Sequence, residues 1–252
     1  MTRIHHLNCG TLHAPPNPAA ACHCLLLEDA SGLALVDTGI GLLDVRSPRD
    51  RIGPALIAAA GFQFHEDQTA VRRVERLGFR AADVRHIVLT HADPDHTGGL
   101  ADFPSAAAHL SAEEHAAVVR GSRRYLPAHF AHGPDWRPCA GPVVEWFGRE
   151  ARRVPLGFAA EVLLVPLFGH TLGHCGVAIR QGDRWLLHAG DAYYLRAELG
   201  RADHPVSALA AQRADDNDRR LASLEHLRRL ARDHAGAVEV FGYHDFTEFP
   251  PE

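Results

Sequence analysis

Residues 85–99 read RHIVLTHADPDHTGG. The first six positions are mostly aliphatic or β-branched, so they predict a buried β-strand. This strand runs directly into a loop that contains His91, Asp93, Asp95 and His96, four side chains that can bind a metal ion. Loops held by a rigid strand keep such side chains in one geometry. The segment therefore predicts a metal site in which alternate side chains face two neighbouring ions.

Further metal-binding side chains follow the ends of other predicted strands. They are His170 after residues 162–167, Asp191 after residues 184–188 and His244 after residues 238–241. The alternative is a polar helix-capping loop with histidines scattered by chance, since the chain contains 19 histidines. The repeated placement at strand ends favours a common site, because the ends of the strands of a sheet meet in space.

Apolar runs separated by turn residues predict the other strands. Residues 22–28 and 33–37 flank the turn sequence Asp-Ala-Ser-Gly and predict a β-hairpin. Residues 175–180 and 184–188 predict a second hairpin. Residues 125–141 have no periodicity and predict a long irregular loop or a set of short turns.

Two helices are predicted in the first half of the chain. One begins at Asp67 as its cap, and its apolar stripe and its stop are Val71, Val74, Leu77 and Gly78. The other begins with a capping box, in which Ser111 caps the backbone and Glu114 reaches back to it.

The last predicted helix covers residues 216–234. The side chains expected to point inward from it are Leu221, Leu224, Leu227 and Leu230. Residues 237–241 then predict the closing strand. The alternation of strands and helices indicates a layered fold of mixed α and β structure.

The composition is that of an ordinary globular protein. The 252 residues, of which 46% are hydrophobic and 23% are charged, are enough for one sizeable domain, so we expect a single domain over residues 1–252. The net charge of −5 gives no reason to expect binding to nucleic acid or to an anionic membrane. We interpret small basic clusters such as Arg123-Arg124 as solvated surface.

Cysteine usage and the N-terminus bear on the location of the protein in the cell. The five cysteines are odd in number and irregularly spaced, which favours a reducing compartment over a disulfide framework. The N-terminus lacks the apolar core of a signal peptide, and the apolar stretch of residues 55–62 is far shorter than a membrane span. We expect a cytoplasmic protein; its oligomeric state, including a homodimer, is left open.

The order of these motifs resembles that of the metallo-β-lactamase superfamily, whose signature is His-x-His-x-Asp-His followed by single His, Asp and His ligands. The matching segments are LVDTG at residues 35–39, residues 90–99, GHTLGH at residues 169–174, Gly190-Asp191 and His244. The resemblance runs the full length of the chain. It implies an α+β fold, a four-layer αβ/βα sandwich with the metals at one edge.

The resemblance also implies a division of the ligands between two divalent ions. The first ion is expected on His91, Asp93 and His170, and the second on Asp95, His96 and His244, with Asp191 bridging both. Asp93 stands where the family has a second histidine. This oxygen ligand leaves iron or manganese open, although zinc is the first choice because histidines dominate the set. The flavodiiron oxygen reductases carry an acidic residue at this place.

Residues outside the ligand set have expected roles as well. The resemblance implies that Asp37 sits behind the ligands and steadies an imidazole; the alternative is a strand-end turn. We interpret His174 and Cys175 as structural. His129 and His132 are interpreted as surface or core residues, with a place in the pocket wall as the alternative.

The expected chemistry is hydrolysis. A hydroxide that bridges the two ions is predicted to be the nucleophile, one ion polarises the substrate oxygen, and Asp95 passes a proton to the leaving group. The N-acyl-homoserine lactonase branch looks most similar, because Tyr194 follows Asp191 by three residues, the spacing of the tyrosine that bonds the lactone carbonyl in that branch. A buried aromatic is the alternative for Tyr194.

These features predict a small-molecule substrate, a lactone or a similar carboxylic ester. Three alternatives stay open: an iron-dependent enzyme that handles oxygen or sulfur, a phosphodiesterase, and a non-catalytic metal-binding protein.

Overall fold

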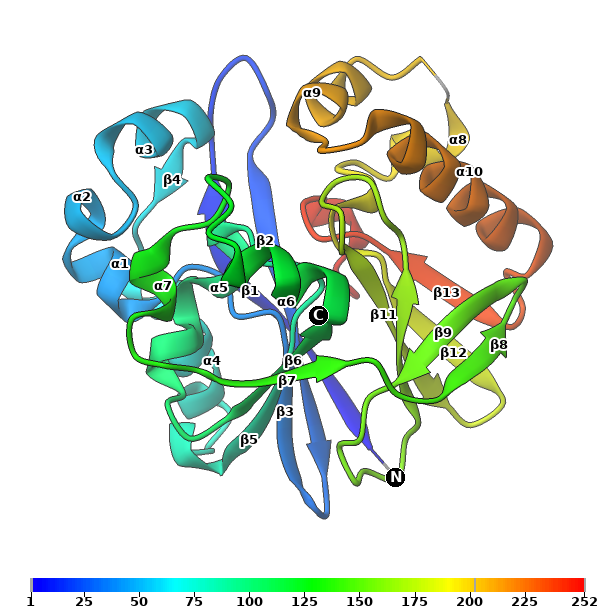
Figure 1. The fold of residues 1–252 in the computed structure, drawn as a ribbon, viewed down its shortest axis with the longest axis horizontal. Helices are drawn as coiled ribbons and strands as arrows, with labels where there is room; N and C mark the ends of the chain where they lie inside the picture. The colour runs from blue at the N-terminus through cyan, green and yellow to red at the C-terminus, as the bar shows by residue number, and fades with distance from the viewer. Residues whose placement is uncertain (1, 202, 252) are drawn as a thin grey trace.

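The computed structural model describes residues 2–201 and 203–251. Two mixed β-sheets lie face to face, and helices cover the outer side of each sheet (Figure 1). This arrangement confirms the predicted four-layer αβ/βα sandwich. No helix in residues 2–201 or 203–251 is long and apolar enough to span a membrane.

The strands divide into two continuous sheets. The seven-stranded sheet has the order β4-β1-β2-β3-β5-β6-β7, from β1 (Arg3–Leu12), β2 (Ala20–Asp29), β3 (Gly32–Val36), β4 (Phe62–Gln63), β5 (Val84–Val88), β6 (Ala107–Ser111) and β7 (Asp135–Cys139). The six-stranded sheet has the order β13-β12-β11-β10-β9-β8, from β8 (Val143–Trp146), β9 (Arg149–Arg153), β10 (Val162–Pro166), β11 (Cys175–Gln181), β12 (Arg184–His188) and β13 (Val238–Phe241). The two predicted hairpins are confirmed as the antiparallel pairs β2–β3 and β11–β12.

The helices are short except for the last one. The α-helices are α1 (Leu42–Arg46), α2 (Pro48–Arg51), α3 (Pro54–Ala60), α4 (Ala70–Arg76), α5 (Pro94–Thr97), α6 (Ala112–Val119), α7 (Pro127–Phe130), α8 (Ala197–Gly200), α9 (Val206–Arg213) and α10 (Asn217–Asp233). The 3-10 helices are η1 (Glu66–Gln68), η2 (Ala81–Asp83), η3 (Gly98–Asp102), η4 (Gly190–Ala192) and η5 (Phe246–Glu248). Figure 1 shows α1 to α4 beside the first sheet and α8 to α10 beside the second.

The alternation of side chains along the buried strands explains the layers. Leu25 and Leu27 of β2 point into the core between the sheets, whereas Leu26 packs in the core between the first sheet and its helices. In β10, Leu164 points into the core between the sheets, and Leu163 points into the core beneath α10. Because successive side chains of a strand point to opposite faces, these wholly apolar runs are buried on both sides.

Several details of the predicted elements are wrong. Helix α4 begins after Thr69, and Asp67 lies in η1 instead of capping it. Leu221 is 45% exposed, because only Leu224, Leu227 and Leu230 fall on the stripe of α10 that faces the sheet. Residues 125–141 contain α7 and the edge strand β7, which pairs with β6.

The loop before α10 is held close to that helix. Gly169 has φ +131°, and a Cβ atom there would lie 2.0 Å from the backbone nitrogen of Arg220, so only glycine fits. The backbone N–H groups of Asp216 and Asp215 donate to the carbonyl oxygens of Gly169 and His170 over 3.0 Å each. These contacts fix the backbone that carries the His170 side chain.

Candidate metal centre

The predicted donors come from four loops at one edge of the two sheets. His91 follows β5, Asp95 and His96 lie on α5, His170 follows β10, Asp191 lies on η4, and His244 follows β13. Each loop begins at a strand end, so the two packed sheets set the distances between the loops.

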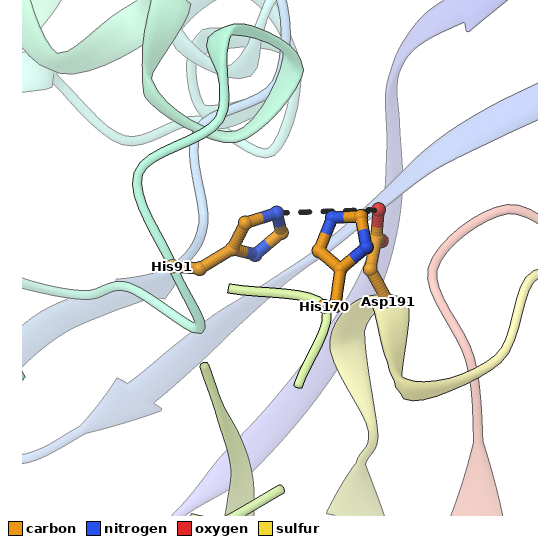
Figure 2. Close-up of side chains that lie close together, drawn as sticks. All are labelled: His91, His170 and Asp191. Carbon is orange, nitrogen blue, oxygen red and sulfur yellow. Dashed lines mark ion pairs between the residues drawn. The ribbon is translucent and has the colours of Figure 1, made fainter. Parts of the chain in front are cut away.

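One group of donors consists of His91, His170 and Asp191, whose metal-binding atoms all lie within 4.8 Å of one another. Figure 2 shows the three side chains converging from separate loops. Asp191 Oδ2 lies 3.3 Å from His170 Nε2 and 4.0 Å from His91 Nε2. All three residues are buried.

A second group, equally compact, consists of Asp95, His96 and His244. Asp95 Oδ2 lies 3.8 Å from His96 Nε2 and 3.7 Å from His244 Nε2. Asp191 of the first group also faces the second group, since its Oδ1 is 3.3 Å from His96 Nε2 and its Oδ2 is 3.3 Å from His244 Nε2. One carboxylate therefore faces donors of both groups.

Several of these atoms are buried without a hydrogen-bond partner. Among the residues that the structure describes, they include His91 Nε2, His96 Nε2 and Asp191 Oδ1. An unpaired buried polar atom is costly, so its presence needs an explanation. Imidazole nitrogens and carboxylate oxygens at these spacings fit a divalent cation such as zinc.

The charges of the cluster depend on one another. Burial opposes ionisation of Asp191, but His244, His96 and His170 hold the pKa of its carboxyl well below the ordinary value. Burial likewise opposes a charge on His96, yet Asp191, Asp37 and Asp95 raise the pKa of that imidazole well above its ordinary value. A bound cation takes the place of such a proton, because metal binding to histidine requires the neutral ring.

Asp37 lies behind His96, as the resemblance implied. His96 Nδ1 donates to Asp37 Oδ2 over 2.8 Å, while the N–H and the hydroxyl of Thr90 donate to the two oxygens of Asp37 over 2.8 Å each. Asp37 and His96 are both fully buried. The contact directs Nε2 of His96 toward the other donors.

Replacing Asp37 with Asn is expected to weaken metal binding about 10- to 100-fold, because one accepting oxygen becomes an NH2 group and the negative charge that orients the His96 ring is lost. Competition for Zn²⁺ with a chromophoric chelator would measure the change. Asp67→Asn is the matched control, since the Asp67 side chain is 65% exposed and lies in η1. An Asp37→Asn protein with unchanged affinity would show that Asp37 is only a turn residue.

Asp93 makes a contact that the sequence did not predict. Arg124 donates through Nε to Asp93 Oδ1 over 2.5 Å and through Nη2 to Asp93 Oδ2 over 2.6 Å. Arg124 Nη2 also lies 2.8 Å from His170 Nε2. The Arg124 side chain is only 17% exposed, so interpreting it as solvated surface was wrong. Burial opposes the charge on Asp93, but Arg124 and His91 hold the pKa of that carboxyl well below its ordinary value.

Glu114 is a second residue whose role the sequence did not predict. Ser111 Oγ accepts from the Glu114 N–H over 3.0 Å, but the Glu114 carboxylate turns away from the helix end, so half of the predicted capping box is wrong. Glu114 Oε1 accepts from the N–H of Ala92 over 2.8 Å, and Oε2 accepts from the hydroxyl of Thr171 over 2.6 Å. It therefore joins the loops that carry His91 and His170.

The phenol ring of Tyr243 and the imidazole ring of His174 support the site from behind. Tyr243 stacks on His96, with ring centroids 3.8 Å apart, and donates its hydroxyl to the carbonyl oxygen of Asp95 over 2.6 Å. His174 Nε2 accepts from the N–H of Asp191 over 3.0 Å, which agrees with a structural role. In the sequence, only the position of Tyr243 next to His244 indicated that Tyr243 lies near the site.

A cavity of about 580 Å³ opens over the donors. Its wall includes Asp93, Asp95, His170, Asp191 and His244. The rest of the wall is largely apolar and includes Leu12, Ile52, Leu56, Phe62, Leu195 and Leu209. A metal centre at the end of an apolar cavity suits a small molecule that has both a reactive polar group and a hydrocarbon part.

Tyr194 is half-buried in the wall of the cavity. Its ring lies edge-on to His170 and His244, with centroids 5.9 and 5.2 Å away. Burial beside Asp191 and Asp93 raises the pKa of the Tyr194 hydroxyl well above its ordinary value. His129 is buried beside Asp44, 3.2 Å from its carboxylate, and His132 is exposed, so neither lines the cavity.

Comparison with known proteins identifies the family. The family model of the metallo-beta-lactamase superfamily matches residues 18–237. The chain belongs to this superfamily. Among the curated metallo-β-lactamase relatives, "Probable metallo-hydrolase Rv2300c" of Mycobacterium tuberculosis is 40% identical, over 96% of this chain and 77% of its own length. The N-acyl homoserine lactonase AttM of Agrobacterium fabrum is 28% identical, over 67% of this chain and 64% of its own length.

Solved structures of metallo-β-lactamase proteins share the fold. An N-acyl homoserine lactone hydrolase with the product N-hexanoyl-L-homoserine at its catalytic metal centre has a TM-score of 0.72 and 20% identity, covering 97% of this chain and 94% of that one. AidC, a dizinc quorum-quenching lactonase, has a TM-score of 0.60 and 21% identity, covering 92% of this chain and 74% of that one. This chain is thus a hydrolytic enzyme of the same superfamily.

Proposed function

We propose that this protein, acting as one domain over residues 1–252, opens a lactone or cleaves a similar carboxylic ester. The observation that carries the proposal is the pair of adjacent donor groups, with Asp191 facing the donors of both, at the wall of an apolar cavity. Relatives and structural neighbours named as N-acyl homoserine lactonases support the same class of substrate. A cytoplasmic location stays a prediction, which the five free and buried cysteines support.

The proposed ligands are those predicted from the sequence. His91, Asp93 and His170 would hold the first divalent ion, and Asp95, His96 and His244 the second, with Asp191 between them. When bound, such a pair of ions supplies a hydroxide nucleophile at neutral pH and polarises the substrate oxygen. Zinc is the first choice, and the oxygen ligand at Asp93 keeps iron and manganese as alternatives.

The side chains of the cavity wall have their own proposed tasks. Asp95 borders the cavity with a side chain that is 13% exposed, so it can take up a proton and release it to a leaving group. Tyr194 can donate its hydroxyl to the substrate carbonyl oxygen. The apolar wall can bind the hydrocarbon part of the substrate and exclude water from it.

Metal analysis of protein purified without added metal, combined with a panel of substrates, tests the proposal. We expect divalent metal in the protein and opening of N-acyl lactones that is faster than cleavage of a phosphodiester. Activity should rise with acyl length until the cavity is filled. Iron in the protein together with oxygen consumption, or cleavage of the phosphodiester alone, would overturn the assignment.

Replacing Tyr194 with Phe is expected to lower kcat about 10- to 100-fold with unchanged metal content, because one hydrogen-bond donor to the carbonyl is lost. Steady-state kinetics with metal analysis would measure this. Tyr193→Phe is the matched control, since the adjacent Tyr193 is fully buried and donates its hydroxyl to Glu248 over 2.8 Å. Equal kcat values for both variants would remove Tyr194 from the mechanism.

A further inference from the structure

We infer that the two ion sites differ in affinity, because Arg124 competes with the ion of the first site for His170. The second site, made by Asp95, His96 and His244, would hold its ion tightly. This inference rests on the proposed pair of ions, and it adds that the pair loads in a fixed order. The feature that carries it is the position of the Arg124 guanidinium among the donors of the first site.

The contact between Arg124 and His170 uses the nitrogen that a metal would use. Arg124 Nη2 lies 2.8 Å from His170 Nε2, and an arginine nitrogen can only donate, so this contact uses the tautomer in which His170 Nε2 carries a lone pair. Asp93 Oδ2 lies 3.1 Å from the same Nε2 and would accept from it in the other tautomer. The same Nε2 lies 3.3 Å from Asp191 Oδ2, on the side where the first group of donors converges. A single lone pair cannot bind the guanidinium and a cation together. An ion can therefore enter the first site only if Arg124 withdraws from His170.

Withdrawal of Arg124 is opposed by contacts on both sides. Toward the site, its guanidinium forms a two-point contact with Asp93 over 2.5 and 2.6 Å, the strong geometry for an arginine and a carboxylate. Away from the site, Nη1 donates to the carbonyl oxygen of Arg213 over 2.6 Å and to Asp215 Oδ1 over 3.3 Å. The side chain is thus bonded at every nitrogen and is mostly buried.

Arg124 also changes the charge that an incoming ion meets. The first site gains a carboxylate from Asp93, but the guanidinium cancels that charge and adds a positive centre at hydrogen-bond distance from two proposed ligands. Repulsion between this centre and a divalent cation is strong in a mostly buried site, where solvent screens little. Asp93 alone would raise the affinity of the first site for a divalent ion. Paired with Arg124, Asp93 would not raise that affinity.

No arginine contacts the donors of the second site in the part of the chain that the structure describes. His96 Nδ1 is bonded to Asp37, and His244 Nδ1 donates to the carbonyl oxygen of Ala21 over 2.9 Å. The Nε2 atoms of both rings face Asp191 at 3.3 Å. These rings are therefore already oriented for an ion, and binding there breaks no contact with a cation.

Titration of metal-free protein with Zn²⁺, followed by competition with a chromophoric chelator, tests the inference. Wild-type protein is expected to bind one ion tightly and a second ion at least about tenfold more weakly. Arg124→Gln should tighten the weaker site by about tenfold or more, because a charge that repels the ion is removed. The tighter site should change by less than about threefold, since Arg124 makes no contact with its donors.

Two further variants separate charge from folding. Arg124→Lys keeps the positive charge and should keep a weak first site. Arg123→Gln is the matched control, because Arg123 is exposed and lines the same cavity beside Arg124. Thermal unfolding of the metal-free proteins shows whether each variant is folded.

The outcomes distinguish this inference from the proposed function. Two equally tight ions in the wild type, or no tightening in a folded Arg124→Gln protein, would refute the inference and leave the proposed hydrolase intact. Failure of the wild type to bind any divalent ion would refute both. If Arg124→Gln fails to fold, an Arg124→Lys protein that binds two equally tight ions would likewise refute the inference.

Discussion

Asp191→Asn is expected to lose at least one bound ion and to lower kcat/KM for lactone opening by about 10³-fold, which corresponds to about 4 kcal/mol of transition-state stabilisation. The physical reason is the position of the carboxylate between the two donor groups. Its oxygens lie 3.3 Å from Nε2 atoms of His170, His96 and His244. Asparagine keeps the shape of the side chain but lacks the negative charge, and its amide nitrogen cannot act as a metal ligand.

Metal content by mass spectrometry and steady-state kinetics on the same preparations would measure both effects. Asp183→Asn is the matched control, since Asp183 is exposed in the turn between β11 and β12 and should retain both metal and activity. An Asp191→Asn protein with the wild-type rate and full metal content would remove this carboxylate from the proposed mechanism.

Glu114→Ala is expected to destabilise the metal-free protein by about 3–5 kcal/mol and to weaken metal binding about 10- to 100-fold. Glu114 is fully buried, and its carboxylate accepts hydrogen bonds from Ala92, Tyr125 and Thr171. Alanine would leave these three donors unpaired in the interior. The loss reaches the metal centre because Ala92 adjoins His91 and Thr171 adjoins His170.

Urea denaturation of metal-free protein gives the stability change, and chelator competition gives the affinity change. Glu114→Gln is the conservative variant and should recover much of the stability, because an amide oxygen still accepts two of the bonds. Glu113→Ala is the matched control, since Glu113 pairs with Arg152 at the surface, and such pairs contribute about 1 kcal/mol or less. Equal effects of Glu113→Ala and Glu114→Ala would contradict the proposed brace between the loops.

Local sequence predicted the parts of the protein that depend on near neighbours. The hairpin β2–β3 follows from two apolar runs around a four-residue turn, and the apolar period of α10 follows from leucines three residues apart. The donor loop after β5 follows from four metal-binding side chains in six positions. In each case the signal lies within a few residues, so side-chain periodicity and turn chemistry are sufficient to show it.

Other contacts needed the folded chain. The Arg124–Asp93 pair joins residues 31 positions apart, and the Glu114–Thr171 contact joins residues 57 apart. Nothing near Arg124 distinguishes it from the exposed Arg123, and Ser111 to Glu114 has the sequence of an ordinary capping box. Glu114 does not close that box because buried donors of two other loops compete for its carboxylate, and unpaired buried donors cost more than an open helix end.

Local sequence patterns predicted the alternation of strands and helices, the strands that end at the site and the side chains proposed to bind metal, while the four-layer fold was implied by the resemblance to the metallo-β-lactamase superfamily. Only the tertiary structure decided which atoms meet, that a guanidinium lies among the donors of the first site, and that one glutamate joins two of the loops. The physical reason is the separation in sequence between the interacting residues. Periodicity depends on consecutive residues, whereas the pairing of buried charges depends on which distant segments the two packed sheets bring together.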